Sequence, residues 1–257
     1  MIFMLAGTSD AKELAEKLKE DGEEIVASVV TEEAAKKLTT SGIRTRIGRL
    51  TDNEMLQALK EERALALLDA SHPFAEEASR NAIEAAKRAE IPYIRYERHS
   101  IHTYDKQVTK VASYEEAADL ASKKGGTVFL TTGSKTLATF VKVLLPNKNV
   151  RMICRMLPRI ENMEKCQQLG IEQKNIVAMQ GPFSKELNLA LYKQFDTDVV
   201  VTKESGKEGS FDEKVTAALE LGLDVILIER PRISYGTVFH TEQEVRNYVK
   251  NMMKEGV

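Results

Sequence analysis

The stretch Thr127-Val-Phe-Leu-Thr-Thr-Gly-Ser-Lys135, near the middle of this 257-residue chain, is the best guide to the fold class. The apolar run Val128–Leu130 is typical of a buried parallel strand, and the polar residues after it predict a turn. From Lys135 onward apolar residues recur every three to four positions, which predicts an amphipathic helix. The turn therefore joins the carboxyl end of a strand to the amino end of a helix, where α/β proteins bind ligands. A capped turn with a solvated lysine fits the same pattern.

This strand–turn–helix pattern recurs on both sides of the stretch. Parallel sheets with helices on both faces are the usual result of such alternation. The pair Gly125-Gly126 is typical of a hinge. We therefore expect an α/β protein with two Rossmann-like, doubly wound domains, residues 1–124 and 125–257, and a cleft between them. The predicted strands are 2–5, 24–30, 44–47, 64–69, 92–96, 128–130, 149–153, 176–179, 199–202 and 224–228, whereas residues 98–111 show no clear period.

The composition is that of an ordinary globular protein. With 42% hydrophobic residues, 30% charged residues and a formal net charge of −2, nothing indicates nucleic acid or an acidic membrane surface as a partner. No apolar run approaches the roughly 18 residues that span a bilayer, and the amino terminus lacks the features of a signal peptide, so we expect a cytoplasmic protein. Cys154 and Cys166 belong to no metal-binding motif, which predicts free thiols and no metal site.

The segment Gly7-Thr8-Ser9 follows the first predicted strand and could form a cofactor phosphate loop. Its glycine allows a close backbone approach, and its hydroxyls lie next to a helix amino terminus. The dinucleotide fingerprint needs three glycines, and residues 6–11 supply only one, so a turn with an N-cap is the alternative. Glu32 and Glu33 fall near the usual distance, about twenty residues on, for an acidic residue that binds ribose.

A second candidate, Asp69-Ala-Ser-His-Pro-Phe-Ala75, follows another buried strand. The proline behind His72 holds this histidine at a strand end, where it could face the cleft. A core or capping histidine is the alternative interpretation.

Six blocks, in order along nearly the whole chain, resemble the signature blocks of the precorrin-6A reductase family, including its cobalt-precorrin-6A form. They are Gly7-Thr8-Ser9, Asp69-Ala-Ser-His-Pro-Phe-Ala75, Thr131-Thr-Gly-Ser-Lys135, Gln180-Gly-Pro-Phe-Ser184, Thr202-Lys-Glu-Ser-Gly206 and Glu229-Arg-Pro231. The resemblance implies a two-domain oxidoreductase of cobalamin biosynthesis that uses NADPH or NADH to reduce one double bond of a corrinoid macrocycle. Ala6, where such proteins often have a second glycine, and Lys12, where an arginine is common, leave the phosphate contacts and the cofactor preference open.

The resemblance and the strand-end positions together give a set of candidate site residues. The proton donor is His72, Lys135 or a bound water, so His72 and Lys135 are the catalytic candidates. The cofactor-binding candidates are Gly7, Thr8, Ser9, Gly133 and Ser134. The substrate-binding candidates are Lys203, Ser205, Gly206 and Arg230.

Bases follow four predicted strands in the second half of the chain, at Lys135, Arg155, Lys203 and Arg230. Together they would create a local positive field suited to the acetate and propionate groups of the macrocycle. Two other functions fit the same loops: a non-catalytic NAD(P)-binding sensor, and a methyltransferase that binds S-adenosylmethionine.

Overall fold

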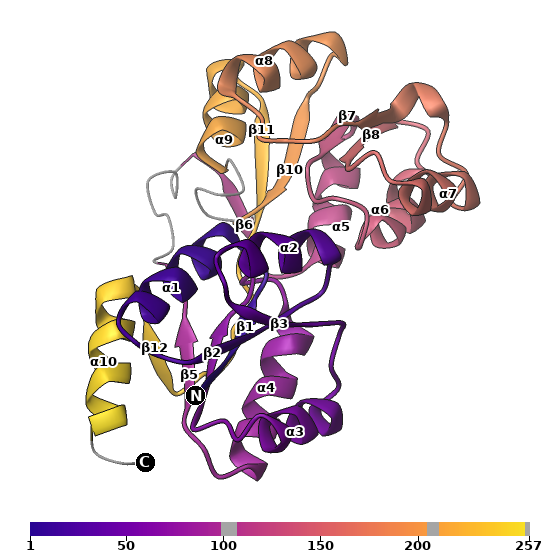
Figure 1. The fold of residues 1–257 in the computed structure, drawn as a ribbon. Helices are drawn as coiled ribbons and strands as arrows, with labels where there is room; N and C mark the ends of the chain where they lie inside the picture. The colour runs from indigo at the N-terminus through magenta and orange to yellow at the C-terminus, as the bar shows by residue number, and fades with distance from the viewer. Residues whose placement is uncertain (99–106, 205–210, 255–257) are drawn as a thin grey trace. The chain divides into compact units, whose positions relative to one another are not determined.

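The computed structural model describes residues 1–98, 107–204 and 211–254, and it divides the chain into two compact units. Unit 1 comprises Met1–His99 together with Pro231–Val257, and unit 2 comprises Ser100–Arg230. Each unit is built on a six-stranded sheet flanked by helices (Figure 1). The predicted α/β class with two parallel, doubly wound sheets is confirmed.

Unit 1 contains both ends of the chain. Its strands are β1 (Ile2–Ala6), β2 (Ile25–Val29), β3 (Arg44–Ile47), β4 (Ala66–Ala70), β5 (Tyr93–Tyr96) and β12 (Thr237–Phe239). Its helices are α1 (Ser9–Glu20), α2 (Glu32–Thr40), α3 (Asp52–Glu61), α4 (Glu76–Arg88) and α10 (Glu242–Lys254). The strand order is β12-β5-β4-β1-β2-β3 with every neighbouring pair parallel, so the chain reverses its direction across the sheet between β1 and β4.

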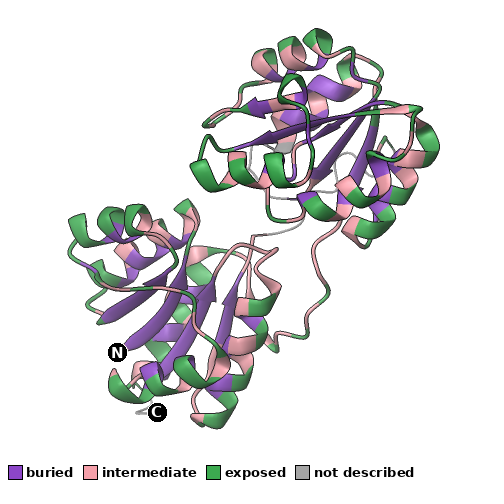
Figure 2. Cartoon of the chain, turned by 90° about the vertical axis from the view of Figure 1, so that its right-hand side faces the viewer, coloured by how far each residue is buried: buried purple, intermediate pink, exposed green. Residues whose placement is uncertain are grey.

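Strand β1 shows why its sequence is apolar throughout. Ile2 and Met4 pack in the core formed with α1, α2 and α10, whereas Phe3 and Leu5 pack in the core formed with α3 and α4. A strand covered on both faces has no solvated side, and β1, β2 and β4 are accordingly buried along their whole length (Figure 2). Full burial of a side chain such as Phe3 contributes roughly 1.5–3 kcal/mol.

Helix α10 lies beside α1, although the two come from opposite ends of the chain (Figure 1). Its residues Val245 and Val249 are buried in the core that contains α1. Arg246 donates to both carboxylate oxygens of Asp21 at 2.6 Å each. The amphipathic stripe of α10 thus completes the first unit.

Unit 2 is continuous in sequence. Its strands are β6 (Thr109–Val111), β7 (Gly126–Leu130), β8 (Val150–Met156), β9 (Ile176–Ala178), β10 (Val199–Lys203) and β11 (Asp224–Ile228). Its helices are α5 (Tyr114–Lys124), α6 (Leu137–Leu144), α7 (Ile160–Gln168), α8 (Lys185–Gln194) and α9 (Phe211–Glu220), with a short 3₁₀ turn at Gln173–Asn175. The order β6-β11-β10-β7-β8-β9 is also fully parallel, and the chain reverses between β7 and β10.

The predicted division into residues 1–124 and 125–257 is wrong, because two short strands that we did not predict decide where the units begin and end. Thr109 of β6 pairs with Ile226 of β11, so the chain before Gly125 is already part of unit 2. Thr237 of β12 pairs with Ile94 of β5, so the chain after Arg230 returns to unit 1.

The pair Gly125-Gly126 is not a boundary but the tight connection from α5 to β7. Both glycines have positive φ, +75° and +73°. A Cβ at Gly126 would also lie 2.3 Å from a carboxylate oxygen of Asp198, which accepts the N–H of Thr127 at 2.7 Å. These glycines are therefore required by local backbone geometry.

The structure also bears on two smaller predictions, on the cysteines and on membrane-spanning helices. Cys154 and Cys166 are free and buried, as expected. None of the helices formed by the described residues is long and apolar enough to cross a bilayer.

Candidate functional site

In unit 1, the loops after β1 and β4 meet at one edge of the sheet. Ala6 and Ala70 are register partners at the ends of these strands, and the Thr8 hydroxyl donates to the Ala70 carbonyl at 3.5 Å. Thr8 also caps α1, because its Oγ1 accepts the N–H of Ala11 at 3.1 Å. The chain reverses between these two strands, and ligands of open α/β sheets bind at such reversal points.

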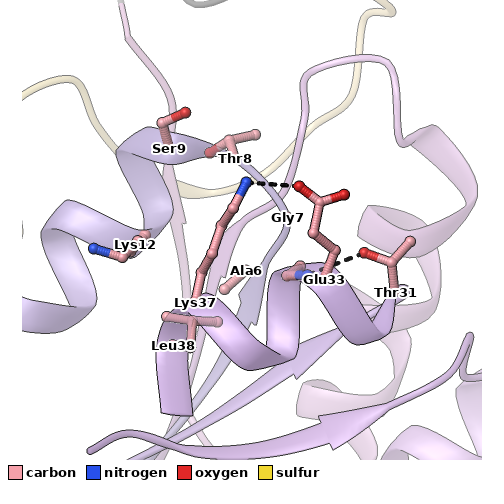
Figure 3. A pocket seen from close by; sticks show the side chains of 10 residues that line it. Ala6, Gly7, Thr8, Ser9, Lys12, Thr31, Glu33, Lys37 and Leu38 are labelled. Atoms are coloured by element: carbon pink, nitrogen blue, oxygen red, sulfur yellow. Dashed lines mark hydrogen bonds and ion pairs between the residues drawn. The ribbon is translucent and has the colours of Figure 1, made fainter. Parts of the chain in front are cut away.

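A pocket of about 270 Å³ lies beside the loop after β1 (Figure 3). It is lined by Ala6, Gly7, Thr8, Ser9, Lys12, Thr31, Glu33, Ala34, Lys37 and Leu38. A Cβ at Gly7 would meet no atom within 4 Å, so the backbone there faces open space. The pocket contains the amino ends of α1 and α2, where the first backbone N–H groups of a helix have no acceptor within the helix and the positive ends of the helix dipoles lie.

Gly7, Thr8 and Ser9 all line this pocket, and the β2–α2 connection adds a second wall. Their role in binding the cofactor stays a prediction. Of the two acidic candidates, Glu33 lines the pocket and Glu32 does not. Lys37, which the sequence analysis missed, pairs with Glu33 at 2.9 Å (Figure 3). Its spacing of four residues from Glu33 on one helix was the available signal.

His72 lies in the loop after β4 and is half-buried. Its Nδ1 accepts the backbone N–H of Phe74 at 3.1 Å, and its ring centroid lies 5.9 Å from that of Phe74. With Nδ1 as the acceptor, the neutral imidazole carries its proton on Nε2. His72 is therefore at the same sheet edge as the β1 loop, with a fixed tautomer.

A buried polar network lies behind this loop and centres on Asp69. The Asp69 carboxylate, which has no exposed surface, accepts hydrogen bonds from the Ser71 N–H at 2.9 Å, the Ser79 hydroxyl at 2.6 Å, the Tyr93 hydroxyl at 2.8 Å and Arg95 Nη1 at 3.0 Å. Burial and the Asp69 charge raise the pKa of Tyr93, so its hydroxyl stays a donor. A buried carboxylate satisfied in this way fixes the end of β4.

Arg95 connects the network to the carboxyl-terminal segment of unit 1. It is fully buried, pairs with Glu97 at 2.8 Å through Nη2, and lies 4.9 Å from the centre of the Tyr235 ring. The Tyr235 ring also stacks on Tyr93, with an interplanar angle of 8°. The returning chain thus helps to hold the loop that carries His72.

In unit 2, the loop after β7 lies at the corresponding reversal point. Thr131 donates to the Val201 carbonyl of β10 through its backbone N–H at 2.9 Å and its hydroxyl at 3.1 Å. The Lys165 ammonium donates to the carbonyls of Ser134 at 2.6 Å and Lys135 at 3.2 Å. The helix begins at Leu137, two residues later than predicted, and the loop is held by these contacts.

Gly133 has a φ of +81°, and no atom lies within 4 Å of the position its Cβ would take. The predicted cofactor residues are therefore divided: Gly133 and Ser134 belong to unit 2, and the β1 loop belongs to unit 1. A role for Gly133 and Ser134 in binding the cofactor stays a prediction.

Three of the four predicted bases, Lys135, Arg155 and Lys203, each lower the pKa of another lysine in unit 2. Burial lowers the pKa of Lys203, and the nearby charge of Lys135 lowers it further. Burial also lowers the pKa of Lys214 to about 7, aided by the charges of Arg155 and Lys203. Sequence analysis missed Lys214, because a lysine in an amphipathic helix usually lies on the solvated face.

Arg230, the fourth predicted base, has a carboxylate partner. Its Nε lies 3.2 Å from Oε1 of Glu204, and both side chains are nearly buried. The predicted substrate residues Ser205 and Gly206 lie outside the described residues.

Comparison with known proteins gives the same relatives at the level of sequence and of structure. The family model described as precorrin-6x reductase CbiJ/CobK matches residues 1–250. The chain is 56% identical to the cobalt-precorrin-6A reductase of Priestia megaterium, over 99% of this chain and 100% of that protein. It is 38% identical to that of Methanocaldococcus jannaschii, over 98% of each chain.

A solved structure of CobK precorrin-6A reductase superposes with a TM-score of 0.81 at 25% identity, covering 98% of this chain and 96% of the other. The match therefore includes both units. The chain belongs to the precorrin-6x reductase CbiJ/CobK family.

Proposed function

We propose that this protein reduces one double bond of a precorrin-6A macrocycle, with or without cobalt, using NADPH or NADH. Family membership over residues 1–250 supports a reductase of cobalamin biosynthesis over a non-catalytic sensor. The observation that carries the cofactor part is the open pocket beside Gly7, with two helix amino ends in its wall. Neither a sensor nor a methyltransferase is needed to account for these features.

The groups around the pocket fit a dinucleotide. Backbone N–H groups at the start of α1, together with the Thr8 and Ser9 hydroxyls, would hold its phosphates. On the other wall, the Glu33 carboxylate can accept a ribose hydroxyl, and the Lys37 ammonium can pair with a 2′-phosphate. The bound cofactor would supply the hydride, and the chain would hold and orient it.

Reduction also needs a proton at the neighbouring carbon. In this proposal His72 donates it from Nε2, or Lys135 donates it from its ammonium group. Lys203 binds a carboxylate group of the macrocycle, and the paired Arg230 holds the adjacent strand end through Glu204.

Parallel titrations with NADPH, NADH and S-adenosylmethionine test the cofactor, followed by cofactor absorbance with and without an oxidised corrinoid. We expect a reduced nicotinamide cofactor to bind and to be oxidised only when the corrinoid is present. Lys37→Met should weaken the binding of NADPH more than the binding of NADH if the 2′-phosphate binds at that wall. Tight binding without corrinoid-dependent oxidation would support the sensor, and preferential binding of S-adenosylmethionine would support the methyltransferase.

A further inference from the structure

An ion pair in unit 1 joins the start of α1 to the chain that follows β5. Nη2 of Arg98 lies 2.7 Å from Oδ1 of Asp10, and these side chains are 37% and 19% exposed. Asp10 is the second residue of α1, directly after Ser9, which lines the pocket. Arg98 is the second residue after β5. The pair therefore lies beside the loop to which the cofactor phosphates are assigned.

The end of β5 also holds Arg98 beside α1. Tyr96 is 5% exposed and packs in the core that contains α1. Burial raises the pKa of Tyr96, and a hydrogen bond from Arg98 to its hydroxyl opposes that rise. Lys17 lowers the pKa of Glu13, and the charge of Arg98 lowers it further. The guanidinium therefore acts on the first two turns of the helix.

The charges around the loop after β1 indicate what this ion pair does for an anion. The amino end of a helix carries about half a positive charge. Lys12, which lines the pocket, pairs with Glu16 at 2.6 Å. Lys37, on the other wall, pairs with Glu33 at 2.9 Å. On its own, the full negative charge of Asp10 would outweigh the charge of the helix end and repel a phosphate. With a guanidinium beside that carboxylate, the helix end keeps its attraction for an anion.

We propose that Arg98 is a positioning residue of the cofactor site, which neutralises Asp10 so that the cofactor phosphates can bind at the start of α1. This inference rests on the proposed function, because it requires a dinucleotide in the pocket of unit 1. Neither Asp10 nor Arg98 is among the described residues that line the pocket, so Arg98 acts through Asp10 and not on the cofactor itself. The pair should therefore set the affinity for the cofactor and leave the chemical step unchanged.

The test is a double-mutant cycle in the full-length chain, in which NADPH and NADH are titrated against Arg98→Met, Asp10→Asn and the double variant. Arg98→Met should weaken the binding of both cofactors about tenfold, since a carboxylate beside the bound phosphates loses this counter-charge. Asp10→Asn should bind both cofactors at least as tightly as the wild type. The double variant should return to within about threefold of the wild-type affinity, because the guanidinium then has no carboxylate to neutralise.

The matched control is Arg246→Met. Arg246 pairs with Asp21 at 2.6 Å, at the opposite end of α1, so its loss changes the net charge equally without altering the start of the helix. This variant should bind both cofactors like the wild type. Added salt should narrow the gap in affinity between Arg98→Met and the wild type, because salt screens the repulsion. At saturating cofactor, kcat should stay near the wild-type value in every variant.

Two results would overturn the inference while leaving the reductase function intact. One is an Arg98→Met variant that binds both cofactors like the wild type. The other is a double variant as weak as Arg98→Met, since Arg98 would then contact the cofactor or support the loop directly. Arg98→Gln, which removes the charge but keeps a donor for Asp10, gives the same comparison if Arg98→Met does not fold. A wild-type protein that binds neither NADPH nor NADH would instead overturn the proposed function.

Discussion

The lead prediction is that replacing Lys214 by methionine stabilises the protein near neutral pH and that this gain shrinks as the pH rises. Burial lowers the pKa of Lys214 from its ordinary 10.5 to about 7. Between these two values the unfolded chain binds a proton that the folded chain does not. The wild type therefore gains stability as the pH rises through this window, and the methionine variant lacks that gain.

The size of the effect follows from the shift. One pKa unit corresponds to about 1.4 kcal/mol, so raising the pH from about 7 to about 9 should stabilise the wild type, through Lys214 alone, by about 2 kcal/mol. The neighbouring charged and titratable groups are Arg155 on β8, Lys203 on β10, Tyr192 on α8 and Glu213 next along α9. They are present in both proteins, so most of their own contribution cancels in the comparison.

The assay is urea unfolding followed by far-UV circular dichroism at several pH values for the wild type, Lys214→Met and the exposed control Lys193→Met. A parallel NMR titration of the lysine side chains would measure the Lys214 pKa directly. We expect Lys214→Met to be the more stable protein near pH 7 and to lose about 2 kcal/mol of that advantage by about pH 9. An advantage independent of pH, or a variant less stable than the wild type near pH 7, would refute a buried Lys214 with a lowered pKa.

The other predictions concern single substitutions. Gly7→Val should fold normally, because a Cβ there meets no atom within 4 Å, and should abolish cofactor binding in a titration; unchanged affinity in a folded variant would place the site elsewhere. His72→Ala should lower turnover more than about tenfold with little loss of stability, and a variant that unfolds readily but turns over normally would show a structural role instead. Lys203→Ala should raise the corrinoid KM, with a steeper loss of substrate affinity than of cofactor affinity in added salt, and a KM indifferent to both salt and the mutation would contradict this. Arg230→Ala should in addition lower the free energy of unfolding by about 1–3 kcal/mol, because the nearly buried Glu204 carboxylate loses one ion pair; equal stability in urea would argue against that pair. Arg95→Met should cost about 3–5 kcal/mol in the same assay, since the buried Asp69 carboxylate loses its guanidinium partner, and a cost under about 1 kcal/mol would mean that the network contributes little.

The longer strands could be predicted from sequence because a strand covered on both faces is mostly apolar, as β1 is at every position and β10 is over its first three residues. The strands β6 and β12 could not, because each is three residues long and partly exposed. Their pairing with β11 and β5 depends on residues far away in the sequence. The domain boundary was misplaced for the same reason.

The candidate site also contains residues that local sequence could locate and residues that it could not. Gly7, Thr8 and His72 were predictable because each directly follows a buried strand, where backbone direction fixes the location. Lys214 was not, because its burial depends on which face of α9 packs against β10 and β11. Glu204 as the partner of Arg230 also depends on two strands being neighbours, a relation that no local pattern contains.

The return of β12 and α10 to unit 1 has a consequence for biosynthesis. The residues of unit 2 form one uninterrupted run of the chain, so that unit needs no segment that is synthesised after it. Unit 1 is completed later, because the outer edge of β5 has no neighbour and the core around α1 stays uncovered until β12 and α10 have been synthesised. Residues that precede unit 2 thus belong to a unit that is completed only after it, and a chain cut shortly after Arg230 would have a complete second unit but an open, aggregation-prone first sheet.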